Sequence, residues 1–299
     1  MRYAKMRRYR MSSVMYDTAV LLFCTVFSLI CFYPIWYVFL GSISSPDSGA
    51  TQAISLLPPV NPYFGYYKTI LQGAVFQRAM FVSVTTTLLG AFLSVLITGT
   101  MAYGVSKTKI KGMRAANFYM VVTMFFSGGL IPYFLLVKNI GLYNTYPVLI
   151  IGHLLPIWNF ILMRNYFAHA VPVELEDAAV IDGANDAILF FKVIMPISMP
   201  LFATMFLLTA VNIWNDWFTY MIFVNRIELQ PFTVVLQKLL IDPNQYLNRL
   251  GTLVGYNTNM VPTALKMTTI MIALIPIFVL YPFLQKYFAK GMLIGAVKG

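Results

Sequence analysis

The chain has 299 residues, of which 59% are hydrophobic and only 10% are charged, and its net charge is +11. Its mean hydropathy is +0.74, whereas soluble domains carry about 25% charged residues. This composition excludes a soluble globular protein and predicts an integral membrane protein. The basic residues flank apolar runs and do not gather in a patch with aromatic residues, so nucleic acid is not an expected partner.

Six apolar runs are long enough to cross the hydrocarbon core of a bilayer, which takes about 20 helical residues. Irregular backbone cannot face lipid, so each run is predicted to be a helix. We therefore predict an all-α integral membrane protein with a single transmembrane domain over residues 1–299. The predicted spans cover about 18–40, 79–105, 116–137, 147–164, 199–224 and 267–288.

Lysine and arginine residues indicate how the spans are oriented, because they concentrate in cytoplasmic loops. The N-terminal stretch MRYAKMRRYR is basic, and the apolar run after it is too long for a cleaved signal peptide. We expect an uncleaved signal anchor with both termini in the cytoplasm. The loop at about 165–198, between the fourth and fifth spans, then lies on the cytoplasmic side.

This loop concentrates acidic residues in a chain that has only ten: Glu174, Glu176, Asp177, Asp182 and Asp186. Pro172 and the acids after it suit the first turn of a helix, where the helix dipole favours negative charge. Gly183 is placed to end that helix in the left-handed conformation, and Asn185 or Asp186 can cap a second helix. The sequence predicts a short helix, a glycine turn and another helix outside the membrane.

The first of these helices carries Ala178 and Ala179 beside its acids. Two small side chains let another protein approach the backbone closely, which favours a docking surface. The alternative is an acidic, solvated loop that only balances nearby cations. Composition alone leaves both interpretations open.

The same segment resembles the EAA loop of ABC-importer permeases, whose pattern is Glu-Ala-Ala, three residues, Gly, nine residues and Ile-x-Leu-Pro. This chain has Asp177-Ala178-Ala179, then three residues and Gly183. Nine further residues separate Gly183 from Val193-Ile194-Met195-Pro196. Aspartate stands for the usual glutamate, valine for isoleucine and methionine for leucine. The spacing matches throughout.

Over nearly its whole length the chain is similar to carbohydrate-type permeases of the maltose and lipoprotein-linked oligosaccharide kind, including the tail FAKGMLIGAVKG. The resemblance implies a type I importer fold of six transmembrane helices with a cytoplasmic coupling helix-turn-helix between spans four and five. It implies coupling to a separate ATPase through Glu174, Glu176, Asp177, Ala178, Ala179, Asp182 and Gly183. It also implies contacts between the ATPase and the C-terminal residues Gly295, Val297, Lys298 and Gly299.

The implied assembly lies in a bacterial cell membrane and contains a second permease subunit, two ATP-binding subunits and an extracytoplasmic solute-binding protein. Its implied substrate is a sugar or oligosaccharide. The chain has no Gly-x-x-x-x-Gly-Lys-Ser/Thr loop, so we expect no cofactor on it and ATP–Mg on the partner ATPase. It has only two histidines and neither a His-Glu-x-x-His nor a Gly-x-Ser-x-Gly motif, so we expect neither an enzyme nor a metal site.

The fifth predicted span contains polar residues within TAVNIWNDWFTY. An acid at the centre of a span costs up to about 3 kcal/mol, so Asp216 should face protein or water. Amides and carboxylates can bind sugar hydroxyls, which predicts a substrate path along Asn212, Asn215, Asp216 and Trp217. Two alternatives stay open: polar contacts between helices at a subunit interface, or a secondary transporter with Asp216 as its ion-coupling carboxylate.

The third predicted span is interrupted by SGGLIP at 127–132. Two glycines and a proline free backbone groups from the helical pattern, so we expect a bend here. Such a bend can line a cavity or can be a plain packing kink.

Overall fold

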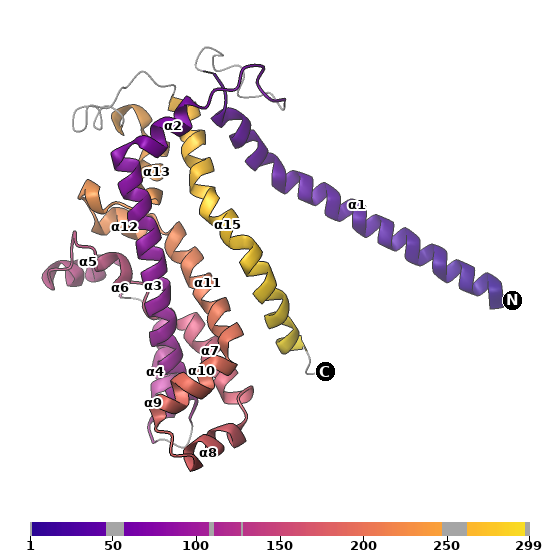
Figure 1. Ribbon diagram of the computed structural model, residues 1–299, viewed down its shortest axis with the longest axis vertical. Helices are drawn as coiled ribbons and strands as arrows, with labels where there is room; N and C mark the ends of the chain where they lie inside the picture. The colour runs from indigo at the N-terminus through magenta and orange to yellow at the C-terminus, as the bar shows by residue number, and fades with distance from the viewer. Residues whose placement is uncertain (1, 46–56, 108–110, 127, 247–261, 297–299) are drawn as a thin grey trace. The chain divides into compact units, whose positions relative to one another are not determined.

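The computed structural model describes the backbone of residues 2–45, 57–107, 111–126, 128–246 and 262–296. Within these residues it contains helices and no strands (Figure 1). The chain divides into two compact units. The first unit comprises Met1–Leu71 and Leu239–Ile272, and the second comprises Gln72–Lys238 and Ala273–Gly299.

The first unit is built on the C-terminal end of helix α1 (Arg2–Ser42), which packs onto α2 (Gly65–Gln72) and the start of α15 (Pro262–Ala296). The Ser42 hydroxyl lies 2.7 Å from the Tyr67 hydroxyl, and the Ser42 carbonyl oxygen accepts a hydrogen bond from Thr268 Oγ1 at 3.1 Å. Gly41 allows this close approach, because a Cβ atom there would lie 1.9 Å from the Met267 sulfur.

The second unit is built around α3 (Ala74–Ser106), which packs against α7 (Ile157–His169) and α11 (Met199–Asn215). Two apolar cores lie along α3. The core at its C-terminal half includes Tyr103, Phe160, Met163, Phe167, Phe190 and Phe202. The core at its N-terminal half includes Val82, Leu149, Ile213, Tyr220, Phe223 and Val234.

Buried hydrogen bonds also join α3, α7 and α11. Asn159 Nδ2 donates to Thr209 Oγ1 at 2.9 Å, and both side chains are buried. The hydroxyl of Thr98 donates to the Leu154 carbonyl oxygen at 3.4 Å. The second of these bonds satisfies a carbonyl group just before α7, where the backbone has no helical partner.

Three of the described helices are long and apolar enough to cross a membrane without a break: α1, α3 and α15. The third predicted span forms two helices, α4 (Met113–Phe125) and α5 (Leu130–Asn139), whose axes diverge by 113°. A second bent pair consists of residues 186–197 and α11, which diverge by 83°. Counting each bent pair as one span gives up to five, so the count of six stays a prediction.

The fourth and fifth predicted spans differ from the continuous helices that the sequence suggested. The fourth is divided into α6 (Val148–Ile151) and α7, with Gly152 to Pro156 between them. Pro156 has no N–H to donate and disfavours helical backbone at Leu155. The fifth is divided into α11 and α12 (Phe218–Phe223), with Asp216 and Trp217 between them.

Two further helical segments follow α12. Residues Ile227–Leu229 form the 3-10 helix η4, and Phe232–Ile241 form α13. The side chains of α1 from Val14 to Tyr33 are exposed. This exposure suits a helix that faces lipid or another subunit.

Candidate functional site

The acidic loop folds into the short helix α8 (Val173–Ile181), with Pro172 at its N-cap rather than in its first turn. Glu174 and Glu176 lie in the first turn, where the helix dipole favours carboxylates. Gly183 ends the helix with a φ of 82°. The Gly183 N–H donates to the Val180 carbonyl oxygen and the Ala184 N–H to that of Ala179, which is the Schellman arrangement.

A second helical segment follows at once, as the sequence predicted. The Asn185 side chain caps it by accepting a hydrogen bond from the Ile188 N–H at 2.8 Å. The segment comprises α9 (Asp186–Ile188), the π-helix η3 (Leu189–Ile194) and α10 (Met195–Ile197). Leu189, Phe190 and Ile194 are buried, so this segment anchors the glycine turn to the core at the C-terminal half of α3.

The surface of α8 is almost entirely exposed, and none of its residues is buried. Ala178 faces outward, whereas Ala179 is partly buried and packs against the same core. Exposed apolar and acidic side chains are therefore mixed on this short helix. We call these side chains the exposed face of α8: Val173, Glu174, Leu175, Asp177, Val180 and Ile181. Such a mixed surface is typical of a protein–protein contact rather than of a solvated acidic loop.

One ion pair joins α8 to the C-terminal end of α3. Lys107 is the residue that follows the last turn of α3, and its ammonium group pairs with the Glu176 carboxylate. The same ammonium group lies 4.6 Å from the centre of the Tyr103 ring. Sequence analysis missed Lys107, because nothing in the sequence brings residues 69 positions apart together.

Asp216 occupies the break between α11 and α12. Its Oδ1 atom accepts a hydrogen bond from the Thr219 N–H at 3.0 Å and so satisfies a donor in the first turn of α12, from the residue before the N-cap Trp217. Its Oδ2 atom lies 3.2 Å from Nε2 of His153, which comes from the break between α6 and α7. The two side chains are only 16% and 19% exposed, so two interrupted helices bring a carboxylate and an imidazole together below the surface.

Sequence analysis did not place His153 in the substrate path. The signal that could have found it is the pair Gly152 and Pro156 within an apolar run, which marks a helix break. The imidazole also contacts the Tyr220 ring edge to face, with 5.8 Å between ring centres. Broken helices at membrane depth are where transporters place polar groups for substrates.

The other predicted path residues do not share one face with Asp216. Asn212, Asn215 and Trp217 are exposed, whereas Thr209 points inward to Asn159. The Asn215 side chain donates to the Val211 carbonyl oxygen of its own helix at 3.0 Å. The predicted path is thus divided: Asp216 lies between α11 and α12 beside His153, whereas Asn212, Asn215 and Trp217 are exposed.

The predicted tail contact falls at the end of the described chain. Gly295 lies in the last turn of α15, while Val297, Lys298 and Gly299 lie outside the described residues. Among the residues that the structure describes, no group of three or more His, Cys, Asp or Glu side chains could hold a metal ion.

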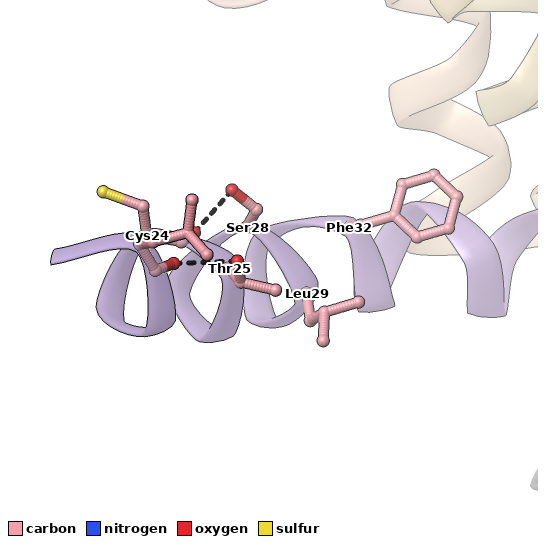
Figure 2. Close-up of a pocket in the computed structure, with 6 residues that line it drawn as sticks. Cys24, Thr25, Ser28, Leu29 and Phe32 are labelled. Atoms are coloured by element: carbon pink, nitrogen blue, oxygen red, sulfur yellow. Dashed lines mark hydrogen bonds between the residues drawn. The ribbon is translucent and has the colours of Figure 1, made fainter. Parts of the chain in front are cut away.

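A shallow groove runs along α1 and is formed by that helix alone (Figure 2). Its lining residues are Leu21, Cys24, Thr25, Ser28, Leu29 and Phe32. The hydroxyls of Thr25 and Ser28 donate to carbonyl oxygens four residues earlier, so they satisfy themselves within the helix. The groove offers no unsatisfied polar group and does not suggest a sugar site.

Comparison with known proteins places the chain in a family. It is 34% identical over 289 residues to the polygalacturonan/rhamnogalacturonan transport system permease protein YtcP of Bacillus subtilis (strain 168), covering 97% of this chain and 100% of that protein. The chain belongs to the permease family of ABC transporters. The permease is also 35% identical to the protein LplC of the same organism, covering 95% of each chain. No model of a protein family matches it.

Solved structures agree with this assignment. A permease chain of a bacterial ABC transporter involved in import of the acidic polysaccharide alginate superposes with a TM-score of 0.83 and 33% identity, covering 93% of this permease and 98% of that chain. A chain of a bacterial alginate ABC transporter, solved with an alginate pentasaccharide-bound periplasmic protein, reaches a TM-score of 0.52 at 15% identity, which shows the fold alone.

The comparisons also bear on the alternatives. The relatives are transport permeases and not enzymes, as the sequence predicted for this permease. They are members of ABC systems, so the alternative of a secondary transporter that uses Asp216 as its ion-coupling group finds no support.

Proposed function

We propose that this permease forms half of the translocation path of an ATP-driven importer of oligosaccharides. The observation that carries the proposal is the exposed face of α8, an acidic and apolar surface on a helix whose C-terminal end is fixed by main-chain hydrogen bonds. The chain lacks a phosphate-binding loop, so energy has to come from another subunit. In this proposal α8 is the coupling helix and docks on a separate ATPase that binds ATP–Mg.

The assembly in this proposal has four kinds of subunit. A second permease completes the path, two ATP-binding subunits drive it, and an extracytoplasmic binding protein delivers the sugar. The loop that holds α8 faces the cytoplasm together with both termini, as the distribution of lysine and arginine favours. Six spans cross the membrane, and the tail from Gly295 to Gly299 reaches the ATPase.

The substrate path passes the helix breaks at His153 and Asp216. These side chains offer hydrogen-bonding groups that are shielded from lipid, and Trp217 beside them offers an aromatic face for a sugar ring. Asn212 and Asn215 are exposed on α11, where a second permease would cover them. A carboxylate next to an imidazole can bind sugar hydroxyls, and removal of either group leaves the other without a partner.

The proposed substrate class follows the relatives. Their names refer to polygalacturonan or rhamnogalacturonan and to arabinooligosaccharides, and the similar solved structure belongs to an importer of alginate. We propose oligosaccharides released from such polysaccharides. The test is to measure which of four oligosaccharide mixtures, from galacturonan, rhamnogalacturonan, arabinan and alginate, the binding protein encoded beside this permease retains.

A transport assay tests the energy source. Membrane vesicles that contain the full complex should take up the retained oligosaccharide only with ATP, and uptake should persist when ionophores collapse the ion gradients. Uptake that needs an ion gradient and continues without the ATPase subunits would overturn the proposed function. Replacing Gly183 with tryptophan should abolish uptake while the chain still inserts into the membrane, because that residue lies beside the exposed face of α8.

A further inference from the structure

The attachment of α8 to the rest of its unit depends on very few side chains. Ala179 packs partly against the core at the C-terminal half of α3. Among the described side chains of α8, Glu176 alone forms an ion pair, and it is also the least exposed acid of the helix, with 14% of its side chain exposed. The Lys107–Glu176 pair therefore links this helix to the end of α3, where the Tyr103 side chain also hydrogen-bonds to the Glu176 carboxylate.

The other end of this link is held firmly. Lys107 follows the last turn of α3, where the helix dipole favours a cation. Its ammonium group lies over the ring of Tyr103. Tyr103 is buried, with its ring centre 5.7 Å from that of Phe167 and 5.3 Å from that of Phe190. The lysine ammonium group thus lies against an aromatic core, and 28% of the lysine side chain is exposed.

We propose that Lys107 is a positioning residue for transport: it holds Glu176, and with it α8, to the C-terminal end of α3. The proposal rests on the proposed function, in which α8 meets the ATPase. Because α3 packs along both α7 and α11, a displacement of α8 that is passed to α3 reaches the two helices that flank the breaks at His153 and Asp216. Without the pair, α8 can follow the ATPase while α3 stays in place.

The experiment uses the full complex in reconstituted membranes and a readout that needs no sugar. Cys24 and Cys31, both exposed and unpaired, are replaced by serine, and Phe218→Cys serves as the reporter at the start of α12, next to the break. Two quantities are measured: the rate of ATP hydrolysis, and the change in maleimide reactivity of the reporter on addition of ATP and vanadate. A coupled complex hydrolyses ATP and also changes the maleimide reactivity of the reporter.

Lys107→Glu should retain ATP hydrolysis but lower the reporter response by about fivefold or more, and Glu176→Lys should lower the reporter response to a similar extent. The charge swap that combines them should restore the response, and Lys107→Arg should keep it. The matched control combines Glu176→Lys with Lys192→Glu, which makes the same two charge changes with an exposed lysine of η3. This control should not restore the response, because Lys192 forms no ion pair with Glu176 among the described residues.

Normal reporter responses in both single variants, or a swap that responds no better than they do, would overturn the role of Lys107. If the single variants assemble with less ATPase, the reporter response is divided by the amount of assembled complex. A normal response per complex would also overturn the role of Lys107. The proposed function fails in a different way. In that case the reporter complex with Lys107 and Glu176 unchanged would itself show no response to ATP and vanadate. The two failures are therefore distinguishable.

Discussion

The Nε2 atom of His153 lies 3.2 Å from Oδ2 of Asp216, and each residue occupies an interruption between two helices. The imidazole comes from between α6 and α7, and the carboxylate from between α11 and α12. Each break takes its polar residue out of a regular helix, and the two breaks lie next to each other. The interruptions thus create a polar contact that faces protein rather than lipid.

Asp216 has two roles in the structure that substitution can separate. Asp216→Asn keeps an acceptor for the Thr219 N–H but removes the negative charge beside His153, whereas Asp216→Ala removes both. We expect the alanine variant to lose about 1 kcal/mol of stability through the missing hydrogen bond. The asparagine variant should keep its unfolding temperature and lose uptake by about tenfold. Normal uptake by it would make Asp216 a purely structural residue.

Substitutions at Gly183 test the backbone conformation of the turn after α8, because they introduce no steric clash. Its φ is positive, but a Cβ atom there would meet nothing within 4 Å. The cost of substitution is therefore conformational, about 1–2 kcal/mol for alanine and less for asparagine, which tolerates the left-handed region. Measured thermal stabilities should rank glycine first, then asparagine, alanine and valine. A valine variant as stable as the parent would contradict the left-handed turn.

The two alanines of the EAA-like segment should respond differently to a large side chain. Ala178→Trp should leave the unfolding temperature unchanged and reduce the amount of ATPase that copurifies, because Ala178 faces outward. Ala179→Trp should cost about 1–3 kcal/mol, because Ala179 packs against the core. Ala187→Trp, on the exposed α9, is the control that should change neither quantity. Equal effects at 178 and 179 would disprove this distinction.

The buried bond between Asn159 and Thr209 tests the packing of α7 on α11. Thr209→Val leaves the Asn159 amide without its acceptor and should destabilise the protein by about 1 kcal/mol. Replacing Asn159 by leucine at the same time removes the unpaired group, so the double variant should recover part of that loss. A double-mutant cycle of unfolding in detergent measures the coupling, and strict additivity would exclude the bond.

Local signals in the sequence predicted the acidic segment well. The positive φ of Gly183 and the Asn185 cap are confirmed, because both depend on residues within a few positions of each other. The interruption of the third span at 127–132 is reflected in the gap between α4 and α5 for the same reason.

Features that depend on distant residues could not be predicted. The Lys107–Glu176 and His153–Asp216 contacts join segments more than sixty residues apart, and periodicity says nothing about such pairs. The breaks in the fourth and fifth spans were also missed, although Gly152 and Pro156 mark the first and Asn215 and Asp216 lie at the second, because each run is apolar when averaged over its whole length. The inward direction of Ala179 required the positions of Phe190 and its neighbours in three dimensions.

The turn between α8 and α9 has a consequence for the rate and strength of assembly. Its shape comes from main-chain bonds at Gly183 and Ala184 and from one side-chain cap, and all of their donors and acceptors lie between Ala179 and Ile188. A partner that binds this surface meets a preorganised element and loses little conformational entropy in ordering it. Association can then be fast, while specificity depends on the few side chains that point outward.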